Sequence, residues 1–182
     1  MENNRYAGLT ALAVLQRKLD SASYLEVIHE GGYCWKAHFT FEAPAVVKDI
    51  EVIKGELQLP LPPTYQQFLL SCNGALLYHD NKYGQWGFRL YGTKNLFTEN
   101  ARWRERYEED WPPAYLAFAE SLGDADLLVL DTAHPVDEDT DCRVIDGDSG
   151  YLPREWRGAA RSFSDWLDRL VVAQGAKYWR WY

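Results

Sequence analysis

Apolar residues recur at helical spacing in some blocks of this chain and at strand spacing in others. The order of these blocks limits the folds that the chain can adopt. Helical spacing is predicted for five segments, which begin near Thr10, Pro44, Pro63, Asn95 and Ser162. Strand spacing is predicted for residues 24–29, 33–41, 76–78, 86–91, 116–119, 127–131 and 142–146. Because the helices and strands do not alternate as in βαβ proteins, their order predicts an α+β fold with a mainly antiparallel sheet.

Short local signals predict where the helices begin and end. Thr10 is a candidate N-cap for the first helix. Asn73-Gly74 predicts a left-handed stop after the helix that begins at Pro63. Ser162 and Asp165 form an S-x-x-D variant of the capping box, so the last helix is expected to begin there.

Apolar stripes predict which helical side chains face the core. In the helix after Pro44, the stripe is expected to hold Val46, Val47, Ile50, Ile53 and Leu57. In the next helix, Tyr65 and Phe68 are predicted to be core residues.

The aromatic end of the chain has two interpretations. Trp179, Trp181 and Tyr182 follow the last helix, and their near-alternate spacing favours an extra strand. The alternative is an exposed aromatic patch of the kind that protein interfaces use.

Length and composition predict one packed domain spanning residues 1–182. The hydrophobic fraction of 47% and the aromatic fraction of 15% argue against intrinsic disorder. No apolar run approaches the ~18 residues of a membrane span, and no signal-peptide segment follows the polar start. Cys34, Cys72 and Cys142 form no CxxC pair, which favours reduced thiols. The expected location is therefore the cytoplasm.

The formal net charge of −8 bears on the kind of partner. Nucleic-acid binders normally present a basic face, so this balance disfavours DNA, RNA and anionic membranes. It favours a basic protein partner, because complementary potentials speed the encounter. The alternative is that the charge only keeps the protein dispersed, and charge alone does not separate the two.

The sequence predicts no catalytic, cofactor or metal site. The acidic run 137–141 is no EF-hand, since Cys142 replaces its glycine and Asp148 its closing glutamate. The four histidines lack metal-ligand spacing, and no serine lies in G-x-S-x-G. Asp131, Asp146 and Asp148 are candidates for an acid–base pair, but aspartates beside glycines at strand ends are more typical of turns.

One segment resembles the SUKH superfamily, also called the Smi/Knr family. The residues that carry the resemblance are Leu61-Pro62-Pro63-Thr64-Tyr65-Gln66-Gln67-Phe68-Leu69, followed by Asn73-Gly74. Lys54 and Gln58 depart from the family pattern, which usually has glutamate and glycine there. The similarity covers about residues 45–172, and the N-terminal helix-hairpin segment and the aromatic tail lie outside it.

The resemblance implies a curved, mainly antiparallel sheet wrapped by helices, with no active site. Bacterial members are widely immunity proteins that bind and neutralise secreted toxins, and fungal members regulate cell-wall synthesis. The leading hypothesis is therefore a non-catalytic immunity protein without a cofactor, which binds a basic toxin domain. The alternative is a regulatory or scaffolding protein that binds a host protein. Neither the residues nor the resemblance predicts the oligomeric state.

Two groups of residues are candidates for partner binding. The acidic group is expected to reach solvent and to steer association, and it consists of Asp137, Glu138, Asp139 and Asp141. Trp179 and Trp181 are candidate anchors if the tail is exposed.

Overall fold

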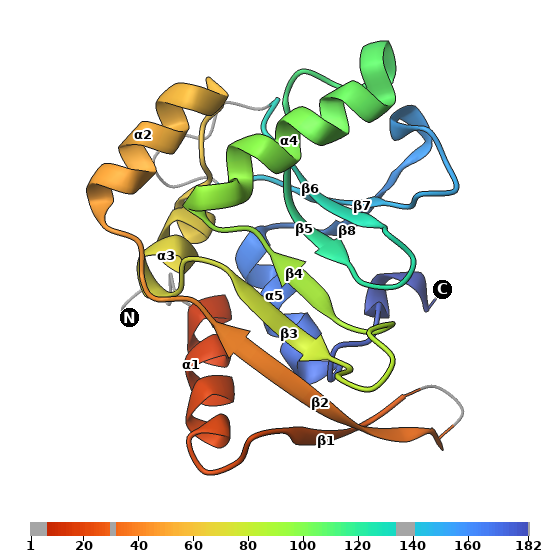
Figure 1. Ribbon diagram of the computed structural model, residues 1–182. Coiled ribbons are helices and arrows are strands. Elements are labelled where there is room, and N and C mark those ends of the chain that lie inside the picture. The colour runs from red at the N-terminus through yellow and green to blue at the C-terminus, as the bar shows by residue number, and fades with distance from the viewer. Residues whose placement is uncertain (1–6, 30–31, 134–140, 182) are drawn as a thin grey trace, which may run out of the picture.

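The computed structural model describes residues 7–29, 32–133 and 141–181. Eight strands form one open antiparallel sheet in this part of the chain, and each strand pairs with the next one along the sequence (Figure 1). The strands are β1 (Leu25–Ile28), β2 (Cys34–Phe41), β3 (Ala75–His79), β4 (Phe88–Leu90), β5 (Tyr115–Ser121), β6 (Leu127–Asp131), β7 (Val144–Gly147) and β8 (Arg157–Ala160). The predicted α+β class and the antiparallel sheet are confirmed.

In the described part of the chain, five helices accompany the sheet, together with short 3-10 turns. They are α1 (Ala7–Leu19), α2 (Val47–Leu57), α3 (Pro63–Ser71), α4 (Thr93–Tyr107) and α5 (Phe163–Val172). In Figure 1, α1 and α5 lie side by side, and α3 packs against both. α2 lies against α4, and α4 packs on β5. The helices therefore cover the sheet in two groups.

The core lies where α3 and α5 meet the central strands. Tyr65 and Phe68 of α3 are fully buried, as predicted. Their rings pack on Phe163 of α5, at centroid distances of 5.2 and 5.4 Å. The Tyr65 hydroxyl donates a hydrogen bond of 2.7 Å to the Tyr91 carbonyl, so its polar end is satisfied inside the core.

Residues 7–29 and 32–43 join the same core as the family-like segment. Leu12 and Leu15 of α1 are buried against the apolar cluster that contains α5. The first half of β2 pairs with β1, and its second half pairs with β3. The N-terminal helix and hairpin are therefore built into the sheet and helix layers.

Several local predictions are wrong in detail. α1 already includes Ala7, so Thr10 lies within the helix and is not its N-cap. Val46 precedes α2 with an extended backbone, and both Val46 and Val47 are exposed, while Ile50 is buried. The buried residues of α2 are Ile50, Ile53 and Leu57, so its first turn stays outside the core.

The end of α3 and the start of α5 test two further predictions, the stop at Asn73-Gly74 and the cap at Ser162. α3 ends at Ser71, but Cys72 is extended, so the left-handed stop is wrong in its geometry. Gly74 instead uses a φ of +107° to enter β3, where a Cβ would lie 3.2 Å from the Leu90 carbonyl oxygen. The Ser162 hydroxyl accepts a hydrogen bond of 3.0 Å from the Asp165 N–H, which confirms the predicted cap.

Candidate functional site

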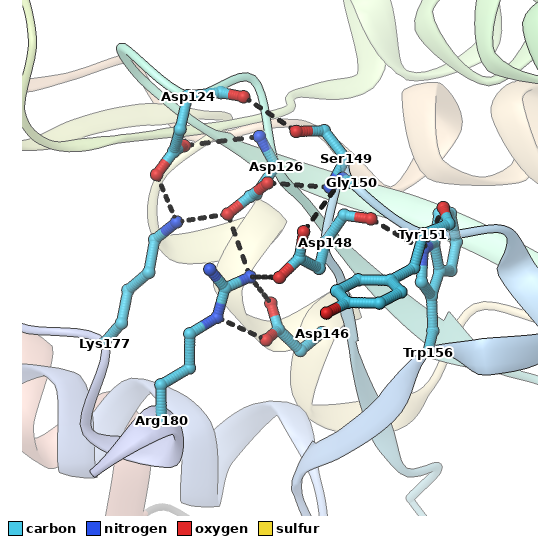
Figure 2. Close-up of polar contacts among 10 residues, drawn as sticks. All are labelled: Asp124, Asp126, Asp146, Asp148, Ser149, Gly150, Tyr151, Trp156, Lys177 and Arg180. Carbon is cyan, nitrogen blue, oxygen red and sulfur yellow. Dashed lines mark hydrogen bonds and ion pairs between the residues drawn. The ribbon is translucent and has the colours of Figure 1, made fainter.

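A network of ion pairs joins the segment after α5 to the turns at one end of β6 and β7 (Figure 2). Lys177 Nζ lies 2.6 Å from a carboxylate oxygen of Asp124 and 2.6 Å from one of Asp126. Asp126 also accepts a hydrogen bond of 2.8 Å from the Ser149 N–H. The carboxylate of Asp126 is buried, and it is therefore held by donors from two different segments.

Arg180 completes the network. Its Nε donates to one oxygen of Asp146 at 2.6 Å, and its Nη2 donates to the other at 2.8 Å. The same Nη2 lies 2.9 Å from Asp126 and 3.4 Å from Asp148. A bidentate pairing of this kind fixes the orientation of the planar guanidinium as well as its position.

The network shifts the pKa values of two of its members, Asp126 and Arg180. Burial acts to raise the pKa of Asp126, but the hydrogen bonds from Lys177 and Ser149 and the charges of Lys177 and Arg180 outweigh it. The pKa of Asp126 is therefore lower than usual. Burial acts to lower the pKa of Arg180, but Asp146, Asp126 and Asp148 raise it further above its ordinary value. Both shifts favour the charged forms of Asp126 and Arg180.

The ion pairs bring the aromatic tail onto the sheet in a form that the sequence did not predict. Residues Tyr178–Arg180 form a 3-10 turn, so the predicted extra strand is wrong. The Trp179 ring is half-buried and contacts Phe88 and Trp166, at centroid distances of 6.1 and 6.4 Å. Trp181 is 51% exposed. Of the two predicted anchors, only Trp181 is largely open to solvent.

Beside the network lies a cleft of about 270 Å³. The tail forms one wall, with Lys177, Arg180 and Trp181, and the loop before β4 contributes Trp86. The indole of Trp86 is 42% exposed, and its ring centroid lies 4.6 Å from that of His29. The cleft therefore has two exposed tryptophan side chains in its lining and charged side chains beside them.

The exposed aromatic surface extends beyond this cleft. A second hollow shares Trp86 and is lined by Tyr33 and Tyr83, both of which are exposed. We call this surface the aromatic face, which consists of Tyr33, Tyr83, Trp86 and Trp181. Its residues come from the β1–β2 hairpin, the β3–β4 loop and the tail.

The predicted acidic group does not form one described surface. Asp137, Glu138 and Asp139 lie outside the described residues. Asp141 is half-buried, and its carboxylate accepts hydrogen bonds from the Thr64 hydroxyl and the Cys142 N–H. Burial raises the pKa of Asp141, which these hydrogen bonds only partly offset. The expectation of a freely solvated side chain is therefore wrong for Asp141, because it packs beside the start of α3.

The remaining candidates for chemistry are dispersed. Among the described residues, no group of three or more histidine, cysteine, aspartate or glutamate side chains is arranged to hold a metal ion. The three cysteines are unpaired, and burial raises the pKa of Cys72 to about 11 and of Cys142 to about 12. Within the described part of the chain, no helix has both the length and the apolar character needed to cross a membrane.

Sequence reasoning missed most of this site. From the sequence, Asp146 and Asp148 are interpreted as turn formers. Asp148 does accept the Gly150 N–H at 2.9 Å, but Asp146 binds Arg180 instead. One combination in the sequence could have indicated the site. Lys177 and Arg180 lie in or beside the aromatic tail, and the chain has several aspartates at strand ends with which they could pair.

Comparison with known proteins agrees with this fold. The SMI1 / KNR4 family (SUKH-1) matches residues 44–169, which is more than half of the chain. The chain is also 25% identical over 178 residues to "Uncharacterized protein YobM" of Bacillus subtilis (strain 168). That alignment covers 92% of this chain and 88% of YobM, so it extends beyond the residues that the family match covers. On the strength of the family match, the chain belongs to the SMI1 / KNR4 family (SUKH-1).

Proposed function

We propose that this protein is a non-catalytic immunity protein, which binds and neutralises a bacterial toxin protein through its aromatic face. The observation that carries the proposal is the exposure of Tyr33, Tyr83, Trp86 and Trp181 on one surface of a SUKH-family domain. Tryptophan and tyrosine are the side chains that most often dominate the binding energy of protein interfaces.

The shape of this surface supports a protein partner over a small substrate. The tryptophan cleft, of about 270 Å³, is smaller than the ~300–1,000 Å³ typical of small-molecule sites. It continues past Trp86 into the hollow between the β1–β2 hairpin and the β3–β4 loop. A broad, shallow aromatic surface of this kind suits the side chains of another protein.

The charge of the chain supports a partner with a basic surface. Five of the 27 acidic residues and one of the 19 basic residues lie outside the described part. The described residues therefore carry a net charge of −4, and the other residues carry the same. Beside the aromatic face, the basic side chains Lys177 and Arg180 are already neutralised by aspartates. An excess of negative charge speeds association with a basic protein.

The test is co-expression with the product of the neighbouring gene, scored as rescue of growth. The native chain is expected to rescue growth, and Trp86→Ala with Trp181→Ala is expected to abolish rescue while the protein stays folded. Tyr151→Ala is the matched control, because Tyr151 is an exposed aromatic outside the aromatic face. Immunity would be rejected in favour of regulation by two results together. The native chain would fail to rescue growth, and it would capture a host protein that the double variant does not bind.

A further inference from the structure

We propose that the cleft lined by Trp86 and Trp181 receives an arginine side chain of the protein partner. This inference rests on the proposed function, since it names the chemistry of the partner at the same surface. The cleft lies between the tail and the loop before β4, with Asp124 at its margin.

The volume of the cleft suits one long side chain. At about 270 Å³ it is below the usual size of a site for a cofactor or a drug-sized ligand. Figure 2 shows Lys177 and Arg180 reaching from the tail toward the aspartates, so their charged ends are already engaged. Apart from Asp124, the rest of the lining combines the aromatic residues His29, Trp86, Phe88 and Trp181 with small and uncharged residues.

The charges around the cleft favour a cation. The network of four aspartates and two basic residues has a formal charge of −2, and its members in the lining of the cleft are Asp124, Lys177 and Arg180. Asp124 is the most exposed member, with 50% of its side chain open, against 20% for Lys177 and 33% for Arg180. An incoming cation therefore meets a carboxylate more readily than it meets either basic group.

The two indoles supply the second element of recognition. A guanidinium over an aromatic ring is attracted by the negative face of the ring, and tryptophan binds cations best. The protein uses this contact elsewhere, since Lys82 lies 4.6 Å from the centroid of Tyr83 and Arg102 lies 4.7 Å from that of Trp103. Trp86 and Trp181 are the exposed indoles of the described residues, and no lysine or arginine side chain among these residues lies over either ring. Arginine fits better than lysine, because its plane stacks on rings while its N–H groups reach a carboxylate.

The cleft is already formed in the free chain, so binding needs little rearrangement. Arg180 and Lys177 hold the tail to the strand ends. The side chain of Gln174 accepts a hydrogen bond of 3.1 Å from the Ile28 N–H, which ties the tail to β1. Preorganised sites lose less conformational entropy when they bind a ligand.

The test titrates the full chain with the peptide Ac-Gly-Arg-Gly-NH2 and follows the indole N–H signals by NMR. Trp86→Phe and Trp181→Phe identify the two signals and keep an aromatic ring. Saturable shifts confined to these indoles are expected, with at least ~10-fold weaker binding of the citrulline peptide, which lacks the charge. Asp124→Asn is expected to weaken arginine binding about threefold, and Glu56→Gln on α2 is the matched control with an unchanged titration.

Three results would overturn the inference: no shift of either indole, equal binding of the citrulline peptide, or equal binding of the matching lysine peptide. The titration contains no toxin, so it fails or succeeds independently of the growth assay. If a partner is found, each of its arginines is changed to alanine in combination with Trp86→Ala. In the Trp86→Ala background, the alanine substitution of one arginine is then expected to have no further effect on affinity. Additive effects for every arginine would also reject the proposal.

Discussion

The guanidinium of Arg180 lies against the carboxylate of Asp146, with two hydrogen bonds of 2.6 and 2.8 Å. The two residues are 34 positions apart in the sequence, in the tail and in β7. This pair holds the 3-10 turn of the tail onto the sheet and thereby positions Trp181 beside the cleft.

Arg180→Gln is expected to lower the free energy of unfolding by about 1–3 kcal/mol, because it leaves two largely buried carboxylates with fewer donors. Urea denaturation measures the loss. Arg157→Gln is the control, since Arg157 is exposed on the edge strand β8, and a change within ±0.5 kcal/mol is expected there. Equal stabilities of the two variants would show that the network does not hold the tail.

Phe68→Ala is expected to cost about 3–5 kcal/mol, because the Phe68 ring is fully buried between Tyr65 and Phe163. Chemical denaturation measures this loss. Phe97→Ala on α4 is the matched control, because Phe97 is largely exposed and is expected to cost less than ~1 kcal/mol. A loss below ~1 kcal/mol for Phe68→Ala would contradict its place in the core.

Stability is expected to fall in acid partly through Asp126. The folded state lowers the pKa of Asp126 below its ordinary value of 3.8, so its ionised form stabilises the fold. This contribution is fully present above the ordinary value and disappears as the pH falls through the lowered one. Asp126→Asn is therefore expected to be less stable than the native chain at pH 7 and to lose less stability on acidification.

Unfolding by urea at several pH values between 7 and 2 measures this difference. Glu56→Gln provides the comparison, because Glu56 is exposed on α2 and its acid profile is expected to follow that of the native chain. Parallel acid profiles for the native chain and Asp126→Asn would contradict the role of Asp126.

Two glycines are expected to respond to alanine with opposite signs. Gly175 has a φ of +85°, and a Cβ there would lie 2.4 Å from Cγ of Tyr78, so Gly175→Ala is expected to lose more than ~1 kcal/mol. Gly55 lies within α2 and faces open space, so Gly55→Ala is expected to gain about 0.5–1 kcal/mol. Thermal unfolding of the pair measures both, and a neutral Gly175→Ala would refute the close packing of the tail on Tyr78.

The acidic segment remains a proposed steering element. Changing Asp137, Glu138 and Asp139 to neutral amides is expected to slow association with a basic partner and to flatten its salt dependence. Asp141→Asn separates this effect from packing, because Asp141 is hydrogen-bonded to Thr64. Binding kinetics over a salt series measure the rates. Unchanged rates in the triple variant would exclude the segment from the interface.

The sequence by itself determined the elements whose signals are local. A stripe of apolar residues at helical spacing placed Tyr65 and Phe68 in the core, and Ser162 capped α5, because both depend on neighbours within two turns of helix. Alternation at residues 33–41 and short apolar runs elsewhere predicted seven of the eight strands of the described residues. β8 (Arg157–Ala160) was missed, because Arg157-Gly158-Ala159-Ala160 has no strand signal of its own and is ordered by pairing with β7.

The candidate site depended on contacts that no local pattern contains. The period of the tail favoured a strand, but Arg180 and Lys177 bind aspartates 30 to 55 residues earlier, and the chain turns to reach them. Val46 and Val47 were exposed for a similar reason, since the packing of α2 decides which of its turns is buried. Spacing along a chain fixes the direction in which a side chain points from its own helix or strand. Only the tertiary structure decides which other residues that side chain contacts.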